Sequence, residues 1–340
     1  MGVKLGGMKS AYLILPDLFL PQRFATEVTT DLFLPALKKI LGRANFSEQP
    51  AQSLEAALCA AFGLPVQNDL PIAAISAKFD GLGAGCWLRA DAVNLRLQRD
   101  QMLLSQVEVT QAEVQQFCSS LNQYFSGQGM TFYAPHPQRW YVRADTLPKM
   151  QTTPLSEVLG CNVRGALPLG EDAPRWHQVF NESQMLLHSH TLNEQREARG
   201  ELPVNSLWLW GGGTLDEILQ KNFDHVATDE EMAQMFAAVA EIPRESSDGL
   251  WRPHEGNQLL VCNALRLALQ AGDFQAWRDA LLAFETNYAQ PLFAALRAGK
   301  LARLQIELLA GENSRRVVLT AADAWRFWRR GKALAKYSMV

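Results

Sequence analysis

The sequence has 340 residues, 48% of them hydrophobic and 20% charged, so it can bury a large core and its length predicts one large domain or two unequal ones. The formal net charge of -3 supplies no overall field for a nucleic-acid backbone, and we expect no nucleic-acid partner. No stretch reaches the roughly 18 apolar residues of a membrane span. The five scattered cysteines lack metal-finger or redox spacing, which favours a reducing cytoplasm.

The first third of the chain alternates between an apolar strand and helices. The apolar run 11–21 predicts a buried strand that ends at a proline turn, with Asp17 at its C-terminal end. We then expect a helix over 30–41, a linker over 42–52, and a helix over 53–63 that Gly63 ends.

The middle of the chain changes to short strands. They are expected over 71–79, 85–93, 102–109, 130–134 and 138–145, the last two as an edge hairpin. A helix interrupts them, because Thr110 and Glu113 form a capping box ahead of apolar residues at helical spacing. A second helix is expected over 172–190, followed by a polar stretch over 191–202.

The last third again alternates strands and helices. We expect strands over 205–210, 223–228 and 258–262, helices over 229–240, 263–272 and 277–299, a hairpin over 304–320, and a short basic helix after it. Thr228 and Glu231 have the spacing of another capping box. This alternation predicts a largely parallel sheet covered on both faces.

Three consecutive glycines follow the strand at 205–210. Gly211, Gly212 and Gly213 lack the G-x-G-x-x-G spacing and the Lys-Ser/Thr pair of nucleotide loops. A tight turn, where the backbone approaches a ligand or another element, is therefore favoured over a phosphate cradle.

Two clusters of polar residues are candidate ligand sites. Arg89, Arg96 and Arg99 lie near Asp91, and arginine can hold a phosphate or carboxylate with two hydrogen bonds; the alternative is a set of surface ion pairs. His190, Asn193 and Arg196 form the second cluster, which either contacts a ligand or fixes the following loop by hydrogen bonds.

The C-terminal stretch 324–336 combines tryptophans with arginines. Arg326, Arg329, Arg330 and Lys332 accompany Trp325 and Trp328 in this stretch. Such a basic aromatic helix can bind an acidic protein partner or a membrane surface. The favoured alternative is a terminal helix whose tryptophans pack and whose arginines face water.

The stretch LLHSHTLNEQREARGELPVNSLWLWGGG resembles a segment of the archaeal-type, cofactor-independent phosphoglycerate mutases. The matching positions are His190, Asn193, Arg196, Gly200, Pro203, Asn205, Gly211 and Gly213. The stretch GCWLRADAVNLRLQRDQMLL resembles the arginine-containing strand pair of that family's inserted cap domain. It is still more similar to a bacterial subfamily of phosphoglycerate-mutase-like regulatory proteins.

The resemblance implies the alkaline-phosphatase-like α/β fold, with a largely parallel sheet flanked by helices and a smaller inserted α+β cap domain. It places the core at 1–70 and 205–340 and the cap domain at 71–204. It also implies that Arg89, Asp91, Arg96, Arg99, His190, Asn193, Arg196, Asn205, Gly211, Gly212 and Gly213 contact a small phosphorylated or carboxylated metabolite.

The departures from the family concern its two divalent metals. Asp17 keeps the first aspartate, but Leu18 replaces the following glycine, and the Asp-Glu-Ala-Gly-His and Gly-Asp-His segments are missing. One aspartate cannot hold two divalent cations, because each needs several anionic or imidazole ligands. We therefore expect a non-catalytic, cytoplasmic binding or regulatory protein without a cofactor, with Asp17 as a relic ligand.

The alternative is an active phosphatase or mutase with a diverged site. It would bind two divalent metals such as manganese or zinc, with Asp17, His177, His188 and His254 converging from distant positions.

Overall fold

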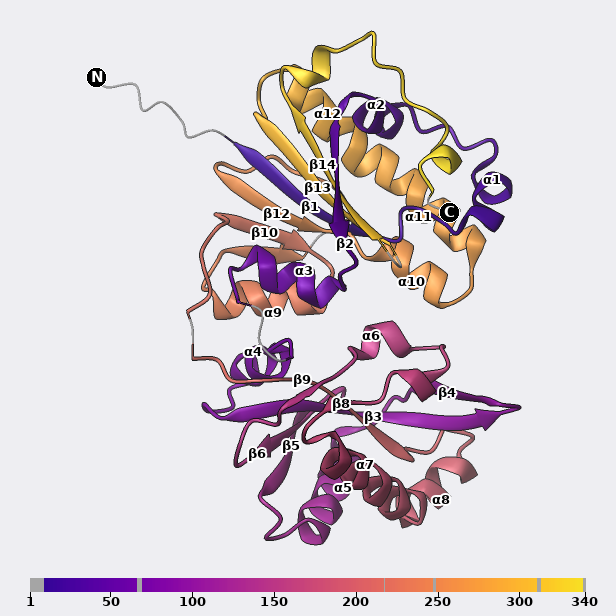
Figure 1. Ribbon diagram of the computed structural model, residues 1–340, viewed down its shortest axis with the longest axis vertical. Helices are drawn as coiled ribbons and strands as arrows, with labels where there is room; N and C mark the ends of the chain where they lie inside the picture. The colour runs from indigo at the N-terminus through magenta and orange to yellow at the C-terminus, as the bar shows by residue number, and fades with distance from the viewer. Residues whose placement is uncertain (1–8, 66–68, 217, 247–248, 311–312, 339–340) are drawn as a thin grey trace. The chain divides into compact units, whose positions relative to one another are not determined.

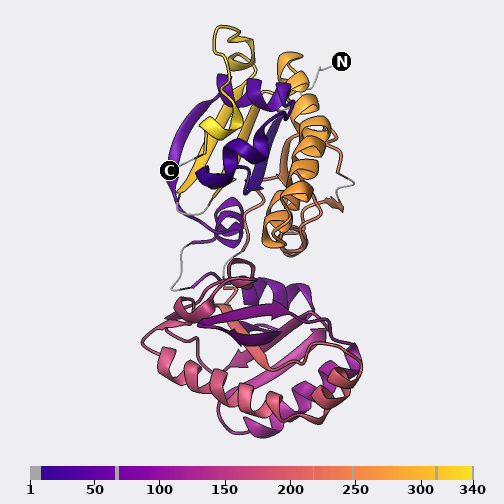
Figure 2. The same ribbon diagram turned by 90° about the vertical axis from the view of Figure 1, so that its right-hand side faces the viewer.

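The computed structural model describes residues 9–65, 69–216, 218–246, 249–310 and 313–338 (Figures 1 and 2). The chain divides into two compact units, of which unit 1 comprises Met1–Gly63 and Leu219–Val340 and unit 2 comprises Leu64–Ile218. Residues 205–218, which the sequence assigned to the core, group with unit 2. Within the described residues, we find no helix with both the length and the apolar character needed to cross a membrane.

Unit 1 is built on one mixed sheet of seven strands in the order β11-β10-β12-β1-β13-β14-β2. The strands are β1 (Ser10–Pro16), β2 (Asn45–Pro50), β10 (His225–Thr228), β11 (Arg244–Ser246), β12 (Asn257–Val261), β13 (Arg303–Leu309) and β14 (Asn313–Thr320). The five strands from β11 to β13 are parallel to one another. At one edge, β14 pairs antiparallel with β13, and β2 pairs antiparallel with β14. The predicted largely parallel sheet is confirmed.

Helices cover both faces of the sheet of unit 1, and β1 at its centre is accordingly apolar from Leu13 to Pro16. Leu13 and Leu15 pack in one core with Trp277 and Leu292, whereas Ile14 points to the opposite face. The helices are α1 (Gln22–Thr29), α2 (Pro35–Arg43), α3 (Leu54–Ala61), α9 (Glu231–Val239), α10 (Ala264–Gln270), α11 (Phe274–Phe284) and α12 (Gln290–Arg297), with a π-helical turn at Glu285–Ala289 between the last two.

Unit 2 contains a five-stranded antiparallel sheet with helices on both faces (Figure 1). Its sheet strands are β3 (Cys86–Gln98), β4 (Gln101–Gln106), β5 (Met130–His136), β6 (Arg139–Ala144) and β9 (Ser206–Gly213), and β7 (Met150–Gln151) pairs with β8 (Leu169–Gly170). Its helices are α4 (Ile72–Phe79), α5 (Gln111–Tyr124), α6 (Leu155–Val158), α7 (Ala173–His188) and α8 (Thr191–Ala198).

Alternate residues of β3 face different helices, as the two-residue period of a strand requires. Leu88 and Ala90 belong to the core that includes residues of α5 and α7, whereas Trp87 packs against Ala73 and Ala77 of α4. We call the second side of the sheet the α4 face. It carries the buried side chains of Ser76, Arg89 and Asp91 that are described below.

Several predicted elements take a different form in the structure. Residues 71–79, expected as a strand, form α4, because a short apolar run has no decisive period and its alanines favour a helix. The expected linker over 42–52 contains β2, which pairs with β14. The expected basic C-terminal helix is wrong: the described residues there form only the 3-10 turns Asp323–Trp325 and Leu334–Lys336.

The two predicted capping boxes differ in outcome. Thr110 and Glu113 form both reciprocal bonds at the start of α5, as expected. At α9, the capping residue is Glu230, which accepts from Ala233 N. Thr228 is not the cap, since its hydroxyl donates to Val261 O.

Candidate functional site

Asp17 lies at the carboxyl edge of the parallel sheet, directly after β1. Its backbone adopts a φ of 57°, its N–H donates to Leu309 O at 2.8 Å, and its carbonyl accepts from Trp277 Nε1 at 3.0 Å. Burial raises the pKa of its carboxyl group, and the positive charge of Arg266 partly offsets this effect. Hydrogen bonds with neighbouring elements thus fix the backbone of Asp17.

Two further residues that could bind a metal follow neighbouring strands at this edge. Asp229 comes after β10, and Cys262 comes after β12. Burial raises the pKa of both groups, and the charge of Asp229 also raises that of Cys262. Within the described residues, however, no set of three histidine, cysteine or carboxylate ligand atoms includes Asp17. These residues do not fit a two-metal centre, which needs several ligands for each cation.

The histidines proposed to converge on Asp17 lie elsewhere. His177 Nε2 is 2.8 Å from Pro168 O within unit 2, and His188 is exposed at the end of α7. His254 belongs to unit 1, where its ring stacks on His225.

The first predicted ligand cluster is divided between the interior and the surface of unit 2. Arg89 is buried on the α4 face, where its Nη2 lies 2.5 Å from Asp91 Oδ1 and its Nη1 donates to Ser76 Oγ at 3.0 Å. Asp91 also accepts from Trp210 Nε1 at 2.7 Å. Arg96 and Arg99, in contrast, are exposed on β3 and in the turn after it.

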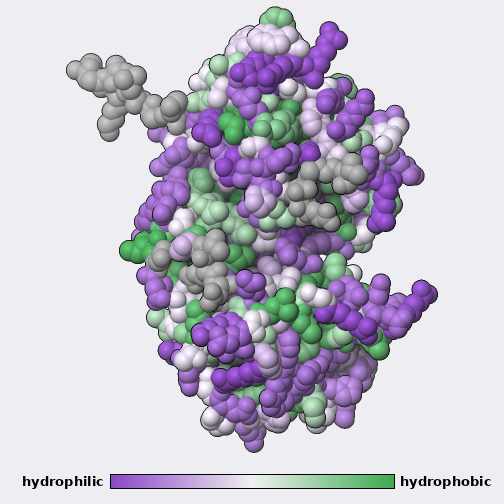
Figure 3. Space-filling model, in the orientation of Figure 1, coloured by the Kyte–Doolittle hydropathy of each residue, from purple (hydrophilic) through white to green (hydrophobic). Residues whose placement is uncertain are grey.

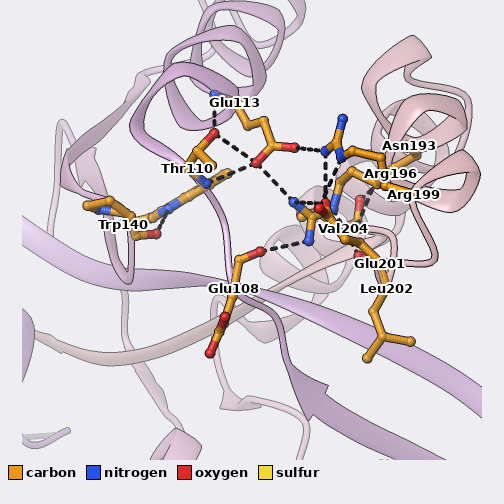
Figure 4. A network of polar contacts seen from close by, with 11 residues as sticks. Glu108, Thr110, Glu113, Trp140, Asn193, Arg196, Arg199, Glu201, Leu202 and Val204 are labelled. Atoms are coloured by element: carbon orange, nitrogen blue, oxygen red, sulfur yellow. Dashed lines mark hydrogen bonds and ion pairs between the residues drawn. The ribbon is translucent and has the colours of Figure 1, made fainter.

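Arg196 belongs to the second predicted cluster. Each nitrogen of its guanidinium group has a hydrogen-bond partner within unit 2. Its Nη1 lies 3.0 Å from Glu113 Oε2, its Nη2 donates to Glu108 O at 2.7 Å, and its Nε donates to Leu202 O at 2.9 Å (Figure 4). Arg199 approaches the other oxygen of Glu113 at 2.7 Å. Arg196 therefore fixes the loop after α8, which is the structural role left open by the sequence.

The other members of the second cluster also hold the backbone. Asn193 accepts from Val204 N and donates to the carbonyls of Leu187 and Val204. Asn205 bonds both backbone groups of Leu95 on β3. His190 caps α8 by accepting from Leu192 N, and its Nε2 is 3.0 Å from Ser120 Oγ.

A polar groove of about 440 Å³ lies beside these residues in unit 2. Arg96, Asn193 and Asn205 line it, and so do Glu194 and Glu197. The two carboxylates oppose an anion, so the groove offers no clear positive potential.

The three glycines lie inside β9 instead of forming a loop after it. Gly211 N donates to Thr152 Oγ1 at 2.8 Å, and Gly212 N donates to Asp69 Oδ2 at 2.9 Å. Gly211 has a φ of 68°, and a Cβ there would be 3.1 Å from Ile72 Cβ. The glycines allow β9 to approach α4 closely, which agrees with the predicted close approach to another element, but the predicted tight turn is wrong. The amides of Gly211 and Gly212 are already bonded, so they do not form a phosphate cradle.

A cavity of about 430 Å³ in unit 1, which we call the basic pocket, was not located from the sequence. Its lining contains five cationic residues and no acidic one: Lys38, Lys39, Arg43, Arg329 and Arg330. Phe33 and Phe327 also line it and are 80% and 77% exposed. The arginine-rich C-terminal motif was the available signal, but the sequence could not show that α2 lies against it.

Close backbone packing brings the two sides of the basic pocket together. A Cβ on Gly331 would be 2.0 Å from Lys38 O, and one on Gly42 would be 2.4 Å from Gly331 N. Arg43 Nη1 also donates to Ala324 O. Figure 3 shows one face of the protein, on which hydrophilic residues cover much of the surface and hydrophobic patches lie between them.

Comparisons with known proteins show which proteins the chain resembles. A probable 2,3-bisphosphoglycerate-independent phosphoglycerate mutase of Geobacter sulfurreducens is 38% identical over 64 residues, which is 19% of this chain and 16% of the relative. A mutase of the same type from Methanothermobacter thermautotrophicus is 30% identical over 105 residues, or 30% of this chain and 26% of the relative. No protein-family model matches the sequence.

The fold also has a counterpart among solved structures. A protein from Pyrococcus horikoshii aligns over 96% of this chain and 92% of its own, with a TM-score of 0.50 and 12% identity. The similarity supports the alkaline-phosphatase-like α/β fold. The chain matches only about a sixth to a quarter of the length of the curated relatives in sequence.

Proposed function

We propose that this phosphoglycerate-mutase-like chain is a cytoplasmic binding or regulatory protein that recognises a small phosphorylated or carboxylated metabolite and does not transfer phosphoryl groups. The observation that carries the proposal is the basic pocket, with five cationic side chains and no carboxylate in its lining. Such a site attracts an anion, and its arginines can bind phosphate or carboxylate oxygens with two hydrogen bonds.

The proposed anion-binding site lies in the basic pocket, and not at the residues of unit 2 that the family resemblance implied. Arg89 and Arg196 are buried against carboxylates of unit 2, and releasing either for a ligand would leave a buried charge without its partner. The cations of the basic pocket have no such acidic neighbour in the lining. Phe33 and Phe327 add apolar walls for the carbon part of a ligand.

The absence of phosphoryl transfer is supported by the ligand set at Asp17. The mutase resemblance implies two divalent metals there, but the described residues place no pair of further ligands beside Asp17. We therefore propose that the protein keeps the fold but lacks the metal ions that would stabilise the charge of phosphoryl transfer.

Anion binding is tested by calorimetry and thermal shift with 2- and 3-phosphoglycerate, citrate and inorganic phosphate. We expect an anion to stabilise the wild type, and the double variant Lys38→Gln/Arg330→Gln to bind it at least about tenfold more weakly, because two charge-assisted bonds are lost. The matched control is Lys300→Gln/Arg303→Gln, which removes two exposed cations of unit 1 that do not line the pocket. Equal affinity in the two double variants would exclude the basic pocket.

Catalysis is tested separately on the same protein. Mutase and phosphatase assays with added manganese should show no turnover that a chelator abolishes. Chelator-sensitive turnover that Asp17→Asn removes would overturn the non-catalytic part of the proposal and leave the binding part standing.

A further inference from the structure

Two histidines and a glutamate from three neighbouring segments of unit 1 meet at the edge of its sheet. His225 begins β10, Glu245 lies on β11, and His254 belongs to the segment before β12. Parallel pairing of β10 with β11 and β12 places their backbones side by side. The ligand atoms of the three side chains all lie within 4.8 Å of one another.

From this cluster we infer a binding site for one zinc-like divalent cation, with His225, Glu245 and His254 as its protein ligands. Imidazole nitrogen and carboxylate oxygen are ligands typical of zinc, whereas magnesium and calcium prefer oxygen alone. Three protein ligands leave a fourth position for water or an external ligand. All three side chains are partly exposed, so a cation can reach them from solvent.

The donor atoms are close enough together for this cation, and binding requires the two rings to reorient. His254 Nε2 is 3.1 Å from Glu245 Oε1. Two donors in a tetrahedral zinc site with bonds of about 2.1 Å are about 3.4 Å apart. The ring centroids of the two imidazoles are 3.7 Å apart and their planes differ by 10°, so the in-plane lone pairs lie in nearly parallel planes. At least one ring must rotate out of this stack before both nitrogens can point at one cation.

An unsatisfied atom indicates that hydrogen bonding alone does not account for the cluster. His225 Nδ1 is buried and has no hydrogen-bond partner, which is costly in a folded protein. Burial lowers the pKa of His225, and the neighbouring His254 lowers it further. The negative charge of Glu245 acts in the opposite direction but does not cancel these effects. His225 Nδ1 also has no hydrogen bond to give up when the ring binds a metal.

The segment that carries His254 is anchored before any metal binds. Asp224 Oδ2 accepts from Asn257 N at 2.7 Å, and Trp251 Nε1 donates to Gln258 Oε1 at 2.9 Å. His225 lies at the start of β10, and Asp229 at the carboxyl edge follows its end. The cation is thus distinct from the metals that the mutase resemblance places beside Asp17.

The test uses the full-length protein after removal of metals with a chelator. Titration with zinc against a chromophoric chelator should show one tight site per chain, and cobalt(II) should give the intense visible absorption of a tetrahedral complex. His225→Ala and His254→Ala should each lower the zinc affinity by more than about 100-fold, because loss of even an outer hydrogen-bond partner of a ligand costs about 10- to 100-fold. Glu245→Gln preserves the shape of its side chain and should also weaken binding.

The controls are His188→Ala, an exposed histidine of unit 2, and Glu241→Gln, an exposed carboxylate of unit 1. Both should bind zinc as the wild type does. Circular dichroism in chelator should show that every variant is folded. The inference is overturned if the wild type binds no stoichiometric zinc, or if the His225 and His254 variants retain its affinity.

Discussion

The buried charges of unit 2 show how a residue that looks like a ligand can be a structural element instead. Arg89 and Arg196 are 5% and 2% exposed, and each lies against a carboxylate that is itself buried. Arginine suits this role because its planar group can satisfy several acceptors at once. The same property makes it a good phosphate ligand, so the residue type alone does not distinguish the two roles.

The ion pair between Glu113 and Arg196 gives a pH-dependent stability. Burial opposes ionisation, but bonds from Thr110 and Arg196 lower the pKa of Glu113 below its ordinary 4.5. A carboxyl group with a lowered pKa in the folded state stabilises it above the unfolded pKa and loses this effect as the pH falls through the folded value. Glu113→Gln should therefore lower the free energy of unfolding by about 3 kcal/mol at neutral pH.

Urea unfolding followed by circular dichroism measures this difference at several pH values. The gap between wild type and Glu113→Gln should shrink as the pH falls below 4.5. Glu171→Gln, which removes an exposed ion pair with Lys149, is the control and should change little at any pH. A gap independent of pH would contradict the ionic origin of the effect.

At the scale of elements, the irregular C-terminal segment owes its position to α2. Its described residues form two short 3-10 turns, and Gly331 allows its backbone to touch that of α2 at Lys38. Arg43 and Arg329 add bonds to Ala324 O and Ala44 O. The expectation that tryptophans of this segment pack inward is wrong for Trp325 and Trp328, which are 55% and 66% exposed.

Gly331→Ala should separate this segment from α2 and open the basic pocket. A methyl group would meet backbone atoms of Lys38, which cannot rotate away as a side chain can. We expect anion affinity measured by calorimetry to fall, with the main unfolding transition retained. Gly165→Ala is the control, because a Cβ there has no atom within 4 Å. Wild-type affinity in Gly331→Ala would contradict the proposed role of this contact.

At the scale of the whole molecule, each unit has a sheet and core of its own. The sheet strands of unit 2 all lie within Leu64–Ile218, including β9, which pairs with β3. The proposed protein partner of the basic aromatic C-terminal segment would meet unit 1, and this partner stays a prediction.

A fragment of residues 64–218 should therefore fold on its own. Its apolar side chains bury against α5 and α7 on one face of the sheet and against α4 on the other. We expect dispersed NMR signals and one cooperative unfolding transition, with Trp140→Ala as a destabilised control. A fragment with the broad signals of a collapsed but unpacked chain would contradict the independence of this unit.

The sequence predicted the parallel sheet, Asp17 at its edge and the capping box at Thr110 because these follow from local patterns. It could not predict which strands pair across long distances, and so β9 was assigned to the core instead of to β3. The basic pocket was not predicted for the same reason, because it joins α2 to the distant C-terminal segment. The cluster of His225, Glu245 and His254 was not predicted because its members, although closer in the chain, lie on separate segments and form no recognisable motif.

The water-exposed indoles of Trp325 and Trp328 contrast with the enclosed ones of Trp140, Trp208 and Trp277. Indole emission shifts to shorter wavelength when water is replaced by an apolar neighbour. Light emitted at the long-wavelength edge of the tryptophan spectrum therefore comes mainly from the surface that Trp325 and Trp328 occupy. A molecule that binds to this surface should therefore shift the tryptophan emission of the unlabelled protein.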